Sequence, residues 1–188
     1  MGGGDGDGRD GRVGEKSCPP LAGCRLEEPR EEDERFMRLA LRHAALAAEG
    51  GEVPVGAVLV AENGTVVAAG RNQVEHRCDP TAHAEIMAVR EGCRCLDNWR
   101  LLNCTLYTTV EPCTMCLSAL LAARVSRLVY GSPDVRLGGV RSWVPLLEKK
   151  HPFHSIAVTE GVLGEEAQSM MVNFFRGRRG ELSTDEIL

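Results

Sequence analysis

The chain has 188 residues, of which 43% are hydrophobic and 26% are charged, and its formal net charge is −5. This length and composition predict one globular domain with an ordinary core, and they exclude a strongly basic nucleic-acid-binding body. No apolar stretch is long enough for a membrane span. The eight cysteines follow no apolar leader, so we expect an intracellular, reducing compartment rather than a disulfide framework.

The first part of the chain, residues 1–30, is predicted to be disordered. Its opening stretch is half glycine, interspersed with aspartate and arginine. Such a composition cannot bury enough apolar surface to offset the entropy of ordering. The segment is also too acidic and too poor in serine for a typical transit peptide. We therefore expect one folded domain at residues 31–180 and a short tail at residues 181–188.

The domain is expected to open with a helix and a β-hairpin. Acidic residues at positions 31–34 favour a helix start, apolar residues then recur at helical spacing, and Gly50-Gly51 ends the helix. Residues 53–60 are predicted to form a buried strand that returns, after a two-residue turn at Asn63-Gly64, as a second strand.

The next predicted helix carries a histidine and a glutamate near its start. It begins near Asp79 and Thr81, either of which can cap it, and runs to about residue 91. His83 and Glu85 then lie in its first turn, beside free N–H groups and the positive end of the helix dipole. That setting favours a negatively charged oxygen.

A strand, a helix and another strand follow in succession. The β-branched segment 105–110 is a predicted strand, residues 113–123 a helix and residues 125–130 the next strand. A crossover of this length joins two parallel strands with a right-handed connection. Pro112 suits helix entry, and thiols placed at a helix N-terminus have a lowered pKa there.

The rest of the domain is predicted to hold a short helix at residues 142–150, a final strand at 155–159 and a helix at 165–179. Helices and strands that alternate in this way predict an α/β fold. We expect a three-layer α/β/α sandwich around a central mixed five-stranded sheet.

Three arginines, Arg176, Arg178 and Arg179, close the last predicted helix. They suit the negative end of its dipole. They are also the one dense basic cluster beside aromatic side chains, which makes them candidates for contact with phosphate. The sequence leaves both interpretations open.

The chemistry-bearing residues are His83, Cys113, Cys116 and Glu85. One histidine and two cysteines, with a fourth position left for water, are a ligand set of catalytic zinc sites. A carboxylate two residues beyond the histidine could move protons beside the metal without being a ligand. A CxxC pair alone is as often redox-active or structural. The His83/Glu85 pair and the Cys113/Cys116 pair, each at a helix start, together predict one catalytic zinc ion.

These motifs resemble those of the cytidine/deoxycytidylate deaminase-like superfamily and, within it, the tRNA-specific adenosine deaminases. The pattern H-x-E…P-C-x-x-C is the mark of zinc deaminases that act on cytosine and adenine. The resemblance runs from about residue 35 to residue 179. It is carried by residues 52–58, 79–85, 106–116 and 174–179. Residues 137–139 and 151–154 look most like plastid members.

The resemblance implies hydrolysis of adenosine to inosine at the wobble position of a tRNA anticodon. It places one zinc ion per subunit on the histidine and the two cysteines, with Glu85 as general acid/base. It implies that Asn72 hydrogen-bonds the flipped adenine and that Val55 helps to wall the pocket. The Ala84 backbone N–H would lie near the reacting centre. Family members work as homodimers on the anticodon stem-loop, in the cytoplasm or the chloroplast.

Two other functions fit part of the pattern. A deaminase of free nucleobases or nucleosides, of the guanine or cytosine type, would use the same zinc site. The arginine-ended helix and the context of Asn72 argue against it. A non-catalytic module with structural zinc would fill the fourth position with a protein ligand. No fourth ligand is well placed in the sequence, and Glu85 would be unexplained.

Overall fold

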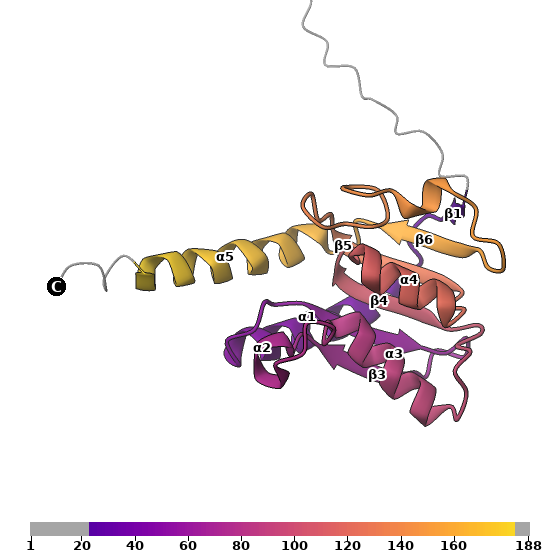
Figure 1. Ribbon diagram of the computed structural model, residues 1–188, viewed down its shortest axis with the longest axis horizontal. Coiled ribbons are helices and arrows are strands. Elements are labelled where there is room, and N and C mark those ends of the chain that lie inside the picture. The colour runs from indigo at the N-terminus through magenta and orange to yellow at the C-terminus, as the bar shows by residue number, and fades with distance from the viewer. Residues whose placement is uncertain (1–22, 183–188) are drawn as a thin grey trace, which may run out of the picture.

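The structure is a computed structural model, and it describes residues 23–182 (Figure 1). Six strands form one sheet in the order β1-β6-β5-β4-β2-β3. The strands are β1 (Cys24–Leu26), β2 (Gly56–Val60), β3 (Val66–Arg71), β4 (Thr105–Val110), β5 (Arg127–Ser132) and β6 (Ile156–Glu160). The helices are α1 (Asp33–Glu49), α2 (Val74–Arg77), α3 (Ala84–Cys95), α4 (Thr114–Ala122) and α5 (Gly164–Leu182), with a 3-10 turn, η1, at Leu146–Glu148. Within this described part, no helix combines the length and the apolarity needed to cross a bilayer.

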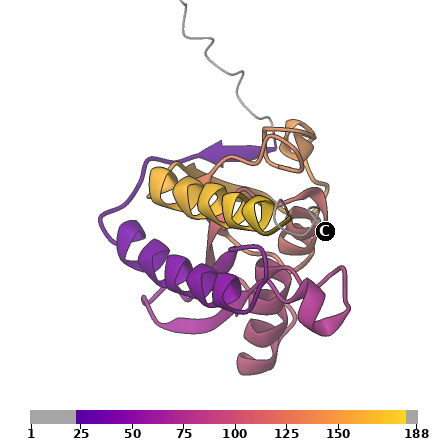
Figure 2. The same cartoon turned by 90° about the vertical axis from the view of Figure 1, so that its left-hand side faces the viewer.

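Helices cover both faces of the sheet, which confirms the expected three-layer α/β/α fold. On one face, α3 and α4 pack over a core that includes Leu59 and Leu106. On the other face, α1 and α5 pack over Val58 and Tyr107, and they lie in front of the sheet in Figure 2. Neighbouring residues of β2 and β4 thus point to opposite cores, because side chains alternate along a strand. The second half of α5 extends past the sheet (Figure 1).

Strand directions are mixed, as expected. β2 is antiparallel to both β3 and β4. β4, β5, β6 and β1 are parallel to one another. The predicted parallel crossover from β4 through α4 to β5 is therefore confirmed. Because β3, β4 and β5 run in the same direction, their carboxyl ends lie at one edge of the sheet.

The expected strand count of five was wrong, and so was the start of the folded domain at residue 31. The sixth strand is β1, which lies within the segment predicted to be disordered and pairs with β6. The Gly23 N–H donates to the Leu147 carbonyl at 2.7 Å, and the Glu27 N–H donates to the Val158 carbonyl at 2.8 Å. These are backbone bonds to distant residues, so composition does not predict them. Residues 1–22, where the rest of that prediction falls, lie outside the described part.

Three local predictions were also wrong. α3 begins at Ala84 and not near residue 80, because Asp79 folds back to accept hydrogen bonds from the Thr81 N–H and hydroxyl at 2.8 and 2.7 Å. The expected helix at residues 142–150 is only the single turn η1. The hairpin loop spans three residues rather than two: the Ala61 N–H donates to the Thr65 carbonyl, and Gly64 has a φ of 79°.

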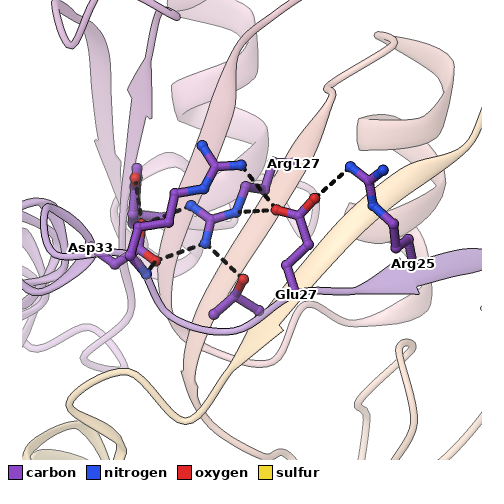
Figure 3. A network of polar contacts seen from close by, with 7 residues as sticks. Arg25, Glu27, Asp33 and Arg127 are labelled. Carbon is purple, nitrogen blue, oxygen red and sulfur yellow. Dashed lines mark hydrogen bonds and ion pairs between the residues drawn. The ribbon is translucent and has the colours of Figure 1, made fainter.

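A buried ion pair ties the sheet to the start of α1 (Figure 3). The Arg127 guanidinium donates to both carboxylate oxygens of Asp33 at 2.7 Å, and neither side chain is more than 4% exposed. The Tyr107 hydroxyl also donates to Asp33, at 2.9 Å, and Arg127 donates to the Thr159 hydroxyl at 2.7 Å. Glu27, just after β1, lies 3.2 Å from Arg127 Nε. Although burial opposes it, these hydrogen bonds lower the pKa of Asp33.

We predict that Arg127→Met destabilises the fold by about 3–5 kcal/mol, because it leaves the buried Asp33 carboxylate without its cation. The matched control is Arg25→Met, since Arg25 also pairs with Glu27 but its side chain is 78% exposed. The control should cost less than about 1 kcal/mol. Urea unfolding followed by circular dichroism measures both. Equal losses in the two variants would contradict the importance of the buried pair.

Candidate active site

The predicted metal ligands lie where two helices begin. His83 is the residue before α3, and Cys113 is the residue before α4. Both have an extended backbone, with φ and ψ of −70° and 154° for His83 and −67° and 169° for Cys113. Neither helix start has a side-chain cap, so both helices direct free N–H groups and positive dipole ends toward the site. Cys116 lies in the first turn of α4 and is buried.

α3 can lie so close to the sheet because β3 has a glycine beneath it. A Cβ atom at Gly70 would overlap the carbonyl oxygen of Ala84 and would lie only 2.7 Å from the Ala88 nitrogen. Any larger residue at this position would push the start of α3 away from the sheet. Gly70 therefore allows the start of α3 to pack close to the sheet, where His83 can reach the two cysteines.

The three ligand atoms form a compact group that fits zinc. His83 Nδ1 lies 3.6 Å from Cys113 Sγ and 3.5 Å from Cys116 Sγ, and all three atoms lie within 4.8 Å of one another. Tetrahedral zinc, with Zn–S of about 2.3 Å and Zn–N of about 2.0 Å, separates its sulfur and nitrogen ligands by about 3.5 Å. The donor set and its spacing therefore suit one zinc ion per chain.

The pKa values of the two thiols are shifted in opposite directions. A hydrogen bond from Cys116, followed in strength by one from His83, lowers the pKa of Cys113 to about 4, although burial opposes the shift. The same contact raises the pKa of Cys116. Cys113 is thus a thiolate at neutral pH, and a thiolate is the form that binds metal.

Glu85 is a buried carboxyl beside this group. It lies in the first turn of α3 and is 3% exposed. Burial raises its pKa to about 7. The compact ligand group consists of the histidine and the two cysteines and does not include Glu85. The carboxyl is therefore available to take up and release protons near neutral pH.

The ligand group opens into a cavity of about 310 Å³. Its lining residues come from the α1–β2 loop, the β3–α3 segment, the end of β4, the start of α4, the loop after β5 and the middle of α5. They are Gly51, Glu52, Val53, Val55, Asn72, Val74, Glu75, His83, Glu85, Val110, Glu111, Cys113, Asp134, Arg136, Leu137, Met171, Phe175 and Arg178. A concave site lined by both apolar and polar groups suits a small-molecule-sized substrate group.

Of the residues predicted from the family resemblance, Val55 and Asn72 line the cavity. Ala84 does not: its side chain is fully buried at the start of α3, and the function expected of its N–H stays a prediction. Among the three arginines of α5, Arg178 lines the cavity and donates to the Gly51 carbonyl at 2.8 Å. Arg176 is exposed and does not line it.

A second hollow lies along α5, next to the cavity. Arg136, Arg178 and Arg179 line it together with Phe175. The Arg136 guanidinium lies 5.9 Å from the centre of the Phe175 ring. Arg178 and Arg179 thus border hollows that Phe175 also lines, and their contact with phosphate stays a prediction.

Glu52 is a site residue that sequence reasoning missed. Its carboxylate is 4% exposed and accepts hydrogen bonds from Asn72 Nδ2 at 3.2 Å and from the His76 N–H at 2.8 Å. These bonds hold the Asn72 amide in one orientation at the wall of the cavity. The available signal was a glutamate immediately before the apolar stretch that leads into β2. Nothing in the sequence showed that this glutamate is buried.

Comparison with known proteins agrees with this chemistry. Residues 30–132 match the family model for the cytidine and deoxycytidylate deaminase zinc-binding region. The chain belongs to the cytidine and deoxycytidylate deaminase family. The tRNA-specific adenosine deaminase of Haemophilus influenzae is 44% identical to this deaminase over 158 residues, which are 84% of this chain and 91% of that protein.

A plant protein and a protein of known structure are also similar to this chain. The chloroplastic tRNA(adenine(34)) deaminase of Arabidopsis thaliana is 46% identical over 167 residues, which cover 80% of this chain but 13% of that much longer protein. A structure solved in a study of A-to-I editing by tRNA:A34 deaminases at the wobble position is 42% identical, with a TM-score of 0.70. It covers 72% of this chain and 98% of its own. The predicted resemblance to tRNA-specific adenosine deaminases is confirmed.

We predict that the purified deaminase binds one zinc ion per chain and that Cys113→Ser or Cys116→Ser reduces this ratio well below one. A serine hydroxyl is a much poorer zinc ligand than a thiolate. Cys95→Ser is the matched control, because Cys95 is exposed at the end of α3. Elemental analysis of the dialysed proteins measures the ratio. A full complement of zinc in Cys116→Ser would contradict the assigned ligand set.

Proposed function

We propose that the chain is a zinc-dependent hydrolytic deaminase that converts adenosine to inosine at the wobble position of a tRNA anticodon. The observation that carries this proposal is the buried, non-ligand Glu85 beside a zinc-type ligand group, inside a cavity that α5 helps to wall. The named tRNA deaminases that the chain resembles over most of its length support the choice of substrate.

The reaction replaces the exocyclic amine of adenine by oxygen and releases ammonia. Zinc held by the ligand group would activate water as the nucleophile at neutral pH. Glu85 takes up the proton that this water loses. It passes this proton to the ring nitrogen. It then takes the second proton from the hydroxyl now bonded to the ring carbon and passes it to the departing amine, so that ammonia leaves as the ring carbonyl forms. A carboxyl with a pKa of about 7 is half-protonated near neutral pH and can therefore move protons in both directions. Its burial keeps bulk water from competing for these protons.

The other groups of the cavity suit a single extruded base. Asn72, oriented by Glu52, can hydrogen-bond the edge of the base. The anticodon loop is single-stranded, so one of its bases leaves the stack at little cost. Phe175 and Arg178, on α5, offer a stacking surface and a cation for the neighbouring nucleotide and its phosphate. Arg136, Arg178 and Arg179, which line the second hollow together, offer a local concentration of positive charge for RNA on a chain whose net charge is −5.

The decisive experiment follows inosine formation in an anticodon stem-loop that carries a wobble adenosine. We predict that Glu85→Gln lowers kcat by at least about 10²–10⁴-fold, since the glutamine cannot carry protons. Glu91→Gln is the matched control, because Glu91 lies on the same helix but outside the cavity. Full activity in Glu85→Gln would contradict the assignment of the catalytic base. An untouched stem-loop together with turnover of free guanine or cytosine would favour the deamination of free bases.

We further propose that two copies of the chain form a homodimer through the segment beside the cavity. Four apolar side chains of this segment are exposed. They are Val135 at 75%, Leu137 at 51%, Trp143 at 55% and Val144 at 38%. Exposed apolar surface concentrated next to a binding site is typical of an interface. The resemblance to tRNA-specific adenosine deaminases, which implies a homodimer, supports the proposed assembly.

The dimer can be tested by sedimentation. We predict that the wild-type chain sediments as a dimer and that Trp143→Glu shifts it toward the monomer, because a charge cannot be buried there without a partner. The matched control is Trp99→Glu, since Trp99 is equally exposed, at 54%, but lies in the turn after α3. A monomeric wild type, or a dimer insensitive to Trp143→Glu, would refute this interface.

One relative is bacterial and another is chloroplastic, so a location in either the cytoplasm or the chloroplast stays our proposal. Imaging of the tagged chain would distinguish these compartments.

We retain one deaminase domain as the proposed organisation. Its start moves from residue 31 to residue 23, because β1 belongs to the sheet.

A further inference from the structure

Glu111 is a buried carboxylate that the proposed chemistry does not use. It follows β4 directly and is 2% exposed. Its oxygens accept hydrogen bonds from the backbone N–H groups of Asp134 at 3.1 Å, Val140 at 3.0 Å, Arg141 at 2.7 Å and Ser142 at 3.1 Å. The Ser142 hydroxyl donates a further bond to it. Five donors from one loop thus converge on one side chain.

A carboxylate satisfies this set of donors better than an amide of the same shape. A carboxylate has two oxygens with about four acceptor positions, whereas a glutamine of the same shape has one acceptor oxygen and one NH₂ donor. A glutamine here would point its NH₂ group at one or more backbone N–H donors, whichever way the amide is turned. The acceptor positions are also filled by the protein's own donors, so Glu111 does not need a substrate or a metal to be satisfied.

The same loop lies directly on the cysteine end of α4. The Gly139 N–H donates to the Pro112 carbonyl at 2.8 Å, and Gly138 forms a β-bridge with Cys113. A Cβ atom at Gly139 would lie 2.9 Å from the Thr114 Cα and 3.0 Å from the Cys113 carbonyl carbon. Two glycines therefore allow the loop backbone to touch the residue that supplies a zinc ligand.

The loop also forms one wall of the cavity. Asp134, Arg136 and Leu137 line the cavity, as Asn72 does, and Arg136 also lines the second hollow along α5. Glu111 therefore connects two parts of the site. On one side is the backbone of a zinc ligand, and on the other is the wall that an RNA substrate would touch.

We propose that Glu111 is a positioning residue that anchors the segment 134–142 on the Cys113 end of α4 and thereby sets the substrate-binding wall of the cavity. The assignment of this wall to the RNA substrate rests on the proposed function. The anchoring itself rests on the five hydrogen bonds and the backbone contacts of Gly138 and Gly139.

The test compares Glu111→Gln with Glu148→Gln, a matched control, since Glu148 is an exposed glutamate of the nearby η1 turn. In Glu111→Gln we expect amide hydrogen exchange in the segment 134–142 to become roughly tenfold faster or more, since one neutral amide oxygen replaces the two charged oxygens that these donors share. We expect KM for the anticodon stem-loop to rise by roughly tenfold, with kcat changed much less. The zinc content should stay at one ion per chain. Glu148→Gln should match the wild type in all four measurements.

A second variant keeps the test decisive if Glu111→Gln fails to fold. Ser142→Ala removes one donor and leaves the carboxylate in place, so it should shift exchange and KM in the same direction by a smaller factor. Unchanged exchange in the segment 134–142 in both variants would overturn the anchoring. A fall in melting temperature and kcat at unchanged KM would also overturn the proposal, because a purely structural residue behaves in that way. Failure of the wild type to deaminate the stem-loop would overturn the proposed function instead, and the exchange data would still decide the anchoring.

Discussion

The site depends on the antiparallel pairing of β2 with both of its neighbours. Because β2 runs against β3 and against β4, these two strands run in the same direction and end at the same edge of the sheet. The chain continues from β3 toward α3 and from β4 into α4, and both helices cover the same face (Figure 1). Two helix N-termini therefore meet at one edge. His83 stands at the first and Cys113 at the second, so one strand pairing brings together ligands that are thirty residues apart.

Three buried carboxylates outside the metal group hold distant segments together, each with different partners. Glu52 and Glu111 lie at this edge, and Asp33 lies at the opposite end of the sheet, where β5 begins. Asp33 is paired with the Arg127 guanidinium and joins α1 to the sheet. Glu52 holds the Asn72 amide, and Glu111 holds a whole loop through backbone N–H groups. A buried carboxylate costs much free energy unless its acceptor positions are filled. Each of the three is therefore a point where distant segments must come together in one arrangement.

Much of the secondary structure could be predicted because its signals are local. Helical spacing of apolar residues indicated α1 and α5, and β-branched runs indicated β2 and β4. β1 could not be predicted, since a three-residue edge strand has no periodic pattern and exists through its pairing with β6. The start of α3 was misplaced for a related reason: Asp79 has the chemistry of a helix cap, but it makes its hydrogen bonds within a local turn.

The sequence by itself determined the zinc chemistry. Imidazole and thiolate groups bind zinc, and a carboxyl group can carry protons. His83 and Glu85, like Cys113 and Cys116, are so close in sequence that they stay near each other in any fold. Only the tertiary structure decided which residues surround that chemistry. The orientation of Asn72 by a buried glutamate and the contribution of α5 to the cavity wall join segments 20 or more residues apart. Such contacts leave no local pattern, because they depend on how the strands are ordered and on which side chains the fold removes from water.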